Sequence, residues 1–140
     1  MKNFKGYISS RRLIDGRYIP QKIQNLTIRT TCERYNYKFL LSSTEYIFDN
    51  SFKMLENLIN NYISNIDGIA FYSIFQLPLE KKLRDKYVIK ILNKNKRILF
   101  SNEKVIINSI DELDIVDQYI NISRTILICP DKNLLLKNYK

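Results

Sequence analysis

The chain has 140 residues, a formal net charge of +9 and a hydrophobic share of 45%, which fit one globular domain with a packed core and exclude a disordered chain. No apolar run approaches the roughly 18 residues that a membrane span needs, so we expect a cytoplasmic protein. Histidine is absent, which excludes a histidine-based catalytic triad, a histidine metal ligand and an imidazole base.

Predicted strands and helices alternate along the chain. The predicted strands are 5–9, 37–41, 69–75 and 97–101, with a short last strand at 125–129; the predicted helices are 20–36, 52–66, 79–95 and one that begins at Ser109. Such alternation makes right-handed βαβ units. We therefore predict a three-layer α/β fold, flavodoxin-like, with a mostly parallel sheet of four to five strands and helices on both faces. This domain should span 1–130, followed by a basic C-terminal tail at 131–140.

No cofactor is expected, because the sequence contains neither a G-x-G-x-x-G fingerprint nor a Walker-A pattern. The two cysteines, Cys32 and Cys129, are far apart and lie in no C-x-x-C pair. We predict that both are buried apolar side chains. Two distant cysteines cannot supply the four ligands of a structural zinc site, so no metal is expected.

The polar residues that follow the predicted strands suggest a binding site. In open parallel sheets, ligands bind beyond the carboxyl ends of the strands. The candidate catalytic residues are Ser10, Glu45 and Glu103; the candidate substrate-binding residues are Ser9, Arg11, Arg12, Gln21, Gln24, Asn25, Ser43, Tyr46, Tyr72, Ser73 and Gln76. Arginines can hold a phosphate or carboxylate there, and a buried glutamate can act as a base. For each residue alone, a structural role in a turn is the alternative.

Lysine and arginine are dense in the first 40 residues, where only Asp15 and Glu33 oppose them. One interpretation is a surface that attracts phosphates, sugar nucleotides or nucleic acid. The other is that the charge reflects the Lys-, Asn- and Ile-rich composition, and both interpretations stay open. Arg29, Arg34 and Arg84 are predicted to lie on solvated helix faces.

Several stretches together resemble one small family. They are GYISSR at 6–11, IPQKIQNLTIR at 19–29, LLSSTEY at 40–46, MLENL at 54–58 and IDGIAFYSIFQLP at 66–78. These resemble the sporadic carbohydrate cluster proteins, which are encoded among genes for bacterial surface-polysaccharide or O-antigen synthesis. The resemblance runs from about Gly6 to Glu103 and implies a setting in carbohydrate biosynthesis, without an assigned reaction.

The order of elements is also similar to the catalytic domain of serine recombinases, the resolvases. Gly6 and Tyr7 match the start of that family's Gly-Tyr-x-Arg-x-Ser strand, but Ser9 stands at the arginine position and Arg11 at the position of the serine nucleophile. A register shift of one residue would offer Ser10 instead. The family's phosphate-binding arginines have no counterpart in SIFQLP at 73–78. The resemblance therefore implies the resolvase fold without the activity.

Three hypotheses follow. The first is a protein of surface-polysaccharide synthesis that binds a sugar phosphate or nucleotide sugar at the sheet edge, with any enzymatic reaction left unassigned. The second is a non-catalytic protein partner of a glycan-synthesis enzyme. The third is a resolvase-like nucleic-acid-binding protein without recombinase chemistry, and we rank nucleic acid last among the partners. We expect no membrane partner, and a homo-oligomer through the apolar faces of the first and fourth helices is open.

Overall fold

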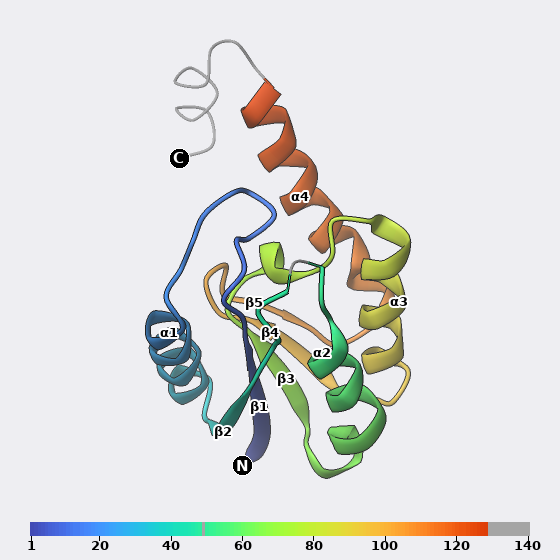
Figure 1. Cartoon of the computed structure of the whole chain (residues 1–140). Coiled ribbons are helices and arrows are strands. Elements are labelled where there is room, and N and C mark those ends of the chain that lie inside the picture. The colour runs from blue at the N-terminus through green and yellow to red at the C-terminus, as the bar shows by residue number, and fades with distance from the viewer. Residues whose placement is uncertain (49, 129–140) are drawn as a thin grey trace.

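The computed structural model describes residues 1–48 and 50–128 and shows an α/β fold built on one five-stranded sheet (Figure 1). The strands are β1 (Lys2–Ile8), β2 (Tyr37–Thr44), β3 (Gly68–Phe71), β4 (Arg97–Phe100) and β5 (Val105–Ile107), in the order β2-β1-β3-β4-β5. The first four strands are parallel, and β5 pairs antiparallel with β4. The predicted fold class is confirmed.

The helices connect the strands in the predicted order. They are α1 (Gln21–Arg34), α2 (Lys53–Asn57), α3 (Lys81–Leu92) and α4 (Leu113–Ile128), with the π turn η1 (Leu58–Tyr62) and the 3-10 turns η2 (Ile63–Asn65), η3 (Ile74–Gln76) and η4 (Ile110–Glu112). Figure 1 shows α1 on one side of the sheet and α2 and α3 on the other. This is the arrangement that right-handed crossovers produce.

One prediction about the end of the domain, the short last strand at 125–129, needs correction. The fifth strand is Val105–Ile107, because the chain reverses in a tight turn after β4 in place of a further crossover. Residues 125–128 belong to α4 and not to a strand, while Cys129 and the predicted tail at 131–140 lie outside the described residues. The antiparallel β5 also separates this sheet from the all-parallel flavodoxin-like arrangement.

The hydrophobic core lies on both faces of the sheet. On the α2 and α3 side, Tyr7, Phe71 and Phe100 are fully buried on three neighbouring strands, and their rings pack in series. On the other side, Phe4 passes over Gly68, where an added Cβ would lie 2.5 Å from the Phe4 ring. Cys32 of α1 is buried there, as predicted.

Within residues 1–48 and 50–128, no helix is both long enough and apolar enough to cross a lipid bilayer.

Candidate functional site

The carboxyl edge of the sheet holds a buried hydrogen-bonded network, which begins at Gln24. This α1 side chain is fully buried, and its amide accepts from the Ser9 backbone N–H at 3.1 Å and donates to the Ser9 carbonyl at 2.7 Å. Gln76 donates to the Gln24 Oε1 at 2.9 Å and to the Ser9 Oγ at 3.4 Å. The network therefore ties the end of β1 to α1 and to the segment after β3.

The segment after β3 is fixed by side chains of its own and of the turn after β4. The Gln76 Oε1 accepts from the Tyr72 backbone N–H at 2.7 Å. Ser73 donates its hydroxyl to Glu103 at 2.7 Å, and the other Glu103 oxygen accepts from the Ile74 N–H at 2.8 Å. Glu103 therefore holds a backbone donor and a hydroxyl donor at the start of η3.

Glu45 closes the same network on the β2 side. Its carboxylate accepts from the backbone N–H groups of Met54 at 3.1 Å and Leu55 at 3.2 Å, and thereby caps the first turn of α2. The Tyr7 hydroxyl donates to the Glu45 Oε2 at 2.9 Å. Burial, opposed by the Arg11 charge, raises the pKa of Tyr7 far above its ordinary value, so this hydroxyl stays protonated.

Arg11 makes its hydrogen bonds within the protein. Its guanidinium donates to the carbonyls of Ser51 at 3.1 Å and Gln76 at 3.0 Å, and to the Tyr7 hydroxyl at 3.2 Å. It also lies over the Phe52 ring, 4.2 Å from the ring centroid. Arg11 therefore joins three segments of the fold with the donors that a phosphate would need.

The other predicted site residues lie around this network. Ser10 accepts from Gln21 at 2.6 Å and is half-buried, whereas Arg12 is exposed and donates to the Gly16 carbonyl. Asn25 turns toward β2, where it accepts from Ser42 at 2.6 Å. Three further residues do not reach the centre of the network: Ser43 is half-buried within β2, Tyr46 is half-exposed, and Tyr72 is buried and uses its backbone. The structure thus brings together the strand ends, but as a packed polar core.

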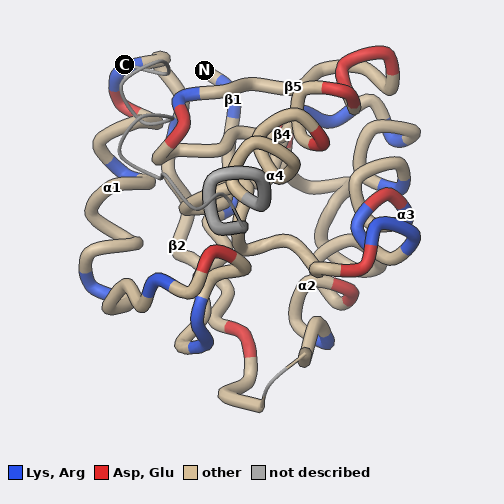
Figure 2. Tube along the Cα trace, turned by 90° about the horizontal axis from the view of Figure 1, so that it is seen from above, with Lys and Arg blue, Asp and Glu red and all other residues tan. Residues whose placement is uncertain are grey.

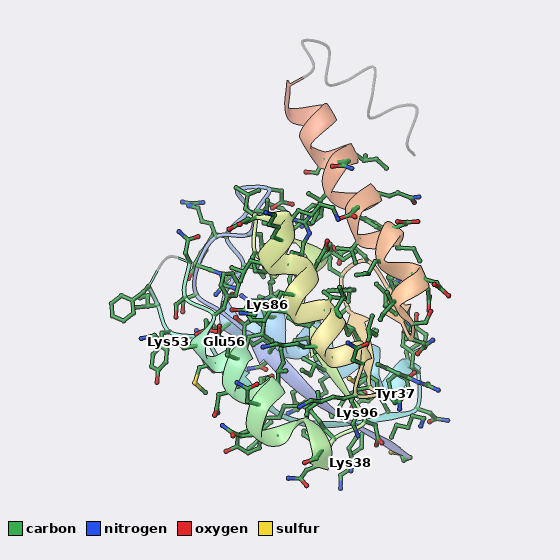
Figure 3. The ribbon with its side chains drawn as sticks, turned by 90° about the vertical axis from the view of Figure 1, so that its right-hand side faces the viewer. Tyr37, Lys38, Lys53, Glu56, Lys86 and Lys96 are labelled. Atoms are coloured by element: carbon green, nitrogen blue, oxygen red, sulfur yellow. The ribbon has the colours of Figure 1, made fainter. Side chains whose placement is uncertain are left out.

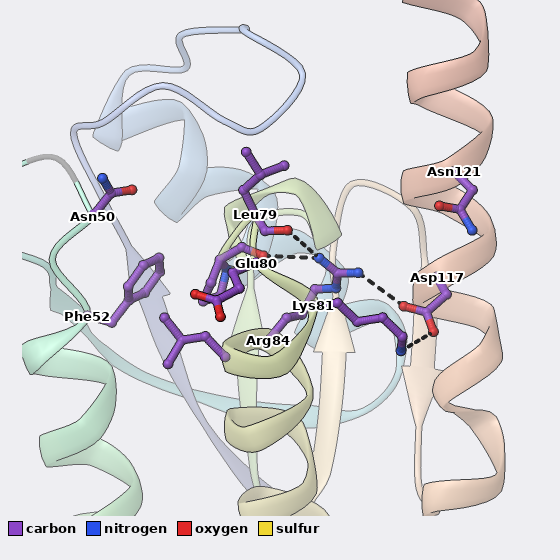
Figure 4. Close-up of a pocket in the computed structure, with 10 residues that line it drawn as sticks. Asn50, Phe52, Leu79, Glu80, Lys81, Arg84, Asp117 and Asn121 are labelled. Carbon is purple, nitrogen blue, oxygen red and sulfur yellow. Dashed lines mark hydrogen bonds and ion pairs between the residues drawn. The ribbon is translucent and has the colours of Figure 1, made fainter.

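An open cavity adjoins the network on the far side of Phe52 (Figure 4). Its volume is about 650 Å³, and it lies between the start of α3 and the middle of α4. Arg84 is 4% exposed there and donates to the carbonyls of Pro78 and Leu79 and to Asp117. The prediction that Arg84 lies on a solvated helix face is therefore wrong, because the chain after η3 folds over it.

Sequence reasoning did not find the residues of this cavity. Lys81 bridges Asp85 at 2.8 Å and Asp117 at 2.9 Å, and partial burial of Asp117 is outweighed by Lys81 and Arg84, which hold its pKa below the ordinary value. Only the i,i+4 spacing of Lys81 and Asp85 is visible in the sequence. Contacts between α3 and α4 depend on packing that no local pattern encodes.

The surface carries cations that are spread over several elements. Seen from above, Lys and Arg positions are distributed around the periphery of the trace, in α1, α3 and the loops (Figure 2). Figure 3 shows Lys38 of β2 and Lys96, which precedes β4, at the same end of the molecule, near Tyr37. Among the described side chains, ion pairs involve only three cations, Arg17, Lys81 and Arg84.

Solved structures of two recombination proteins are among those that share this fold. A resolvase family site-specific recombinase from Streptococcus pneumoniae aligns with a TM-score of 0.58 and 10% identity, over 98% of this chain and 99% of that chain. The N-terminal catalytic domain of TP901-1 integrase aligns with a TM-score of 0.56 and 22% identity, over 89% of this chain and 99% of that chain. No family model matches the chain, and no curated protein matches it in sequence. The chain thus has the fold of a serine recombinase catalytic domain.

The comparisons correct the functional expectation. The structures that share the fold are a site-specific recombinase and an integrase domain, and no match supports a carbohydrate-cluster family. The expected sugar phosphate or nucleotide sugar partner, with its place in surface-polysaccharide synthesis, is therefore wrong. Ranking nucleic acid last among the partners was wrong as well.

Proposed function

We propose that this protein binds nucleic acid through phosphate contacts and does not carry out recombinase chemistry. The observation that carries the proposal is the excess of cations without an ion pair. The formal net charge is +9, and most cations among the described residues make no ion pair. A phosphate backbone is the polyanion that such a surface attracts.

The cations at the amino edge of the sheet are the proposed main contacts. Lys2 and Lys38 lie at the starts of the neighbouring strands β1 and β2, because the partner of Lys38 across the sheet is Asn3, the residue after Lys2. Lys96 directly precedes β4. Tyr37 stacks on Phe4 with the ring centroids 4.2 Å apart and accepts from Arg97 at 3.1 Å. Basic side chains suit a nucleic acid backbone, and aromatic rings beside them suit its bases. A cytoplasmic location belongs to the same proposal.

The carboxyl edge supports the second half of the proposal. The Ser10 hydroxyl has Gln21 as its partner, and Arg11 is turned inward. The segment Ser73–Pro78 forms η3 and the turn after it and contains no arginine. Cleavage by a serine needs cations that stabilise the charge on the attacked phosphate. We propose that Arg12 and Ser10 contact the nucleic acid backbone and take no part in cleavage.

The test is binding of a labelled DNA duplex over a range of salt concentrations. We expect the logarithm of the binding constant to fall linearly with the logarithm of the salt concentration, with a slope of about −0.9 for each phosphate contacted. The double variant Lys38→Gln/Lys96→Gln should bind more weakly and reduce the slope by roughly 2. No covalent protein–DNA adduct should appear on a denaturing gel.

The matched control removes two lysines elsewhere. Lys53 and Lys86 each line a surface pocket together with Glu56 (Figure 3), so each has a carboxylate in its surroundings. Lys53→Gln/Lys86→Gln should leave the slope nearly unchanged. Absence of binding at low salt, or equal losses in both double variants, would contradict the proposed surface.

A further inference from the structure

A second cavity, separate from the carboxyl-edge network, lies between α1 and the turn that joins β4 to β5. Its volume is about 350 Å³. From α1 it is lined by Thr30, Thr31 and Arg34, and from the turn by Ser101, Asn102 and Lys104. The turn is fixed by the Lys104 N–H, which donates to the Ser101 carbonyl, and by the Tyr35 hydroxyl, which donates to the Lys104 carbonyl. Hydrogen bonds therefore fix the backbone of the turn that lines this cavity.

The lining offers hydrogen-bond donors in excess. Ser101 is 2% exposed, and its hydroxyl has no hydrogen-bond partner within the part of the chain that the structure describes. A buried hydroxyl without a partner costs free energy, and an acceptor in the cavity would relieve that cost. The Thr31 hydroxyl instead donates to the Thr27 carbonyl at 2.8 Å, and so is already satisfied.

The charge of the lining has one sign. Arg34 and Lys104 both face this cavity, no carboxylate lines it, and the ion pairs of the described side chains include neither cation. Glu103 is adjacent to the turn but bonds to Ser73 and the Ile74 N–H. Two cations, a buried hydroxyl and an amide around a small volume match the oxygens of a phosphoryl group.

We propose that this cavity is a phosphate-binding site. It deepens the proposed function and rests on it for one point, that the phosphate is part of a nucleic acid backbone. A phosphoryl group on a small molecule has the same chemistry, and the experiment separates the two sources. The volume accommodates one phosphoryl group and part of the sugar that carries it.

The test uses the backbone amide signals of the protein in solution NMR, with inorganic phosphate as the first probe. Saturable shifts should appear at Thr30, Ser101, Asn102 and Lys104. Ser101→Ala should fold at least as stably as the natural chain, because the lost hydroxyl has no partner, yet bind phosphate several-fold more weakly. Wild-type phosphate affinity in this variant would overturn the assignment of the hydroxyl.

The charged groups are tested by Lys104→Gly and Arg34→Gln. Lys104 has a positive φ of 57°, so glycine fits the backbone there and the variant removes only the side chain. Together these substitutions should weaken phosphate binding about tenfold or more. The control, Arg29→Gln, removes the same charge from α1 at a side chain that lies over the Phe39 ring, outside the cavity. Equal loss in the control would overturn the site.

A DNA duplex is the second probe. Shifts at the same four amides would assign the phosphate to a nucleic acid backbone. Shifts with inorganic phosphate and a 5′-mononucleotide, but not with a duplex that binds elsewhere, would keep the site and overturn its polymeric ligand. No response to phosphate would overturn the site even if the duplex binds, whereas a duplex that does not bind at all would overturn the proposed function and leave the site standing.

Discussion

At the scale of single residues, the buried amides of Gln24 and Gln76 explain how polar strand ends become part of the core. An amide carries both donors and an acceptor, so one side chain can satisfy an N–H and a carbonyl together. Gln24 does this for both backbone groups of Ser9, and Gln76 does it for Tyr72 and for Gln24 itself. Amides are needed here because an ionised carboxylate can only accept hydrogen bonds and an ammonium can only donate them.

This account predicts a large loss of stability for Gln76→Leu. The substitution leaves the Tyr72 N–H buried without this partner and removes one of the two donors to the Gln24 Oε1, so the free energy of unfolding should fall by about 3 kcal/mol. Urea denaturation measures the change. Gln21→Leu is the control, because it removes one bond at the half-buried Ser10 and should cost less than about 1 kcal/mol. An equal fall in the free energy of unfolding in the two variants would contradict a larger contribution of the buried network to stability.

At the scale of elements, α2 depends on a cap that is remote in sequence. The N-cap residue Phe52 makes no side-chain hydrogen bond to the helix. The Glu45 carboxylate, directly after β2, accepts from the backbone N–H groups of the first turn instead. A negative group at this end also complements the helix dipole. The short helix and the edge strand are thereby joined by one side chain.

Glu45→Gln should therefore destabilise the protein by about 2 kcal/mol, because an amide keeps the size but loses the charge and one acceptor oxygen. Thermal unfolding or urea titration would measure it. Glu33→Gln, at an exposed position of α1, should change stability by less than about 0.5 kcal/mol. If Glu45→Gln is as mild as this control, the cap is not a main support of α2.

The elements themselves could be predicted from the sequence, whereas their connections could not. Apolar runs and helical periodicity placed β1 to β4 and the four helices, because those patterns record which side of an element is buried. The Glu45 cap was missed because its donors lie nine and ten residues further along the chain. β5 was missed because three residues are too few to show a pattern.

For the site, the sequence shows which polar residues follow the strands, and the structure shows their partners within the protein; their roles toward a ligand stay predictions. Arg11 and Glu45 were predicted to meet a ligand, and both are occupied by partners within the protein. The hydrogen-bond partners of Arg11 and Glu45 belong to other segments of the chain. Which partner each side chain has depends on three-dimensional packing, which a turn-like sequence does not encode.

The contact between α3 and α4 should weaken in acid. Partial burial of Asp117 is outweighed by Lys81 and Arg84, which hold its pKa below the ordinary 3.8. The other carboxylates shown around this cluster are Asp85, which pairs with Lys81, and Glu80, which lines the same cavity. A lowered pKa contributes stability above pH 4 that is lost as the pH falls through the folded value. In Asp117→Asn, the fall of stability between about pH 5 and pH 2 should be shallower than in the natural chain. Parallel curves would contradict this role.

At the scale of the whole molecule, the excess of positive charge should make stability depend on salt in an unusual direction. A protein stabilised by surface ion pairs loses stability when salt screens them. Here the net charge is +9, and the described ion pairs engage only Arg17, Lys81 and Arg84, so repulsion between cations outweighs attraction. Screening should then stabilise the folded state.

We therefore expect the unfolding temperature to rise by roughly 3 °C when sodium chloride is raised from about 10 mM to about 150 mM at neutral pH. Lys38→Gln/Lys96→Gln should reduce this rise, since it removes two of the repelling charges, and Lys53→Gln/Lys86→Gln should reduce it less because Glu56 lines a surface pocket with each of these lysines. An unfolding temperature that falls with salt would mean that attractive pairs dominate the surface. The cations would then be balanced, and the electrostatic reason for expecting a polyanionic partner would be lost.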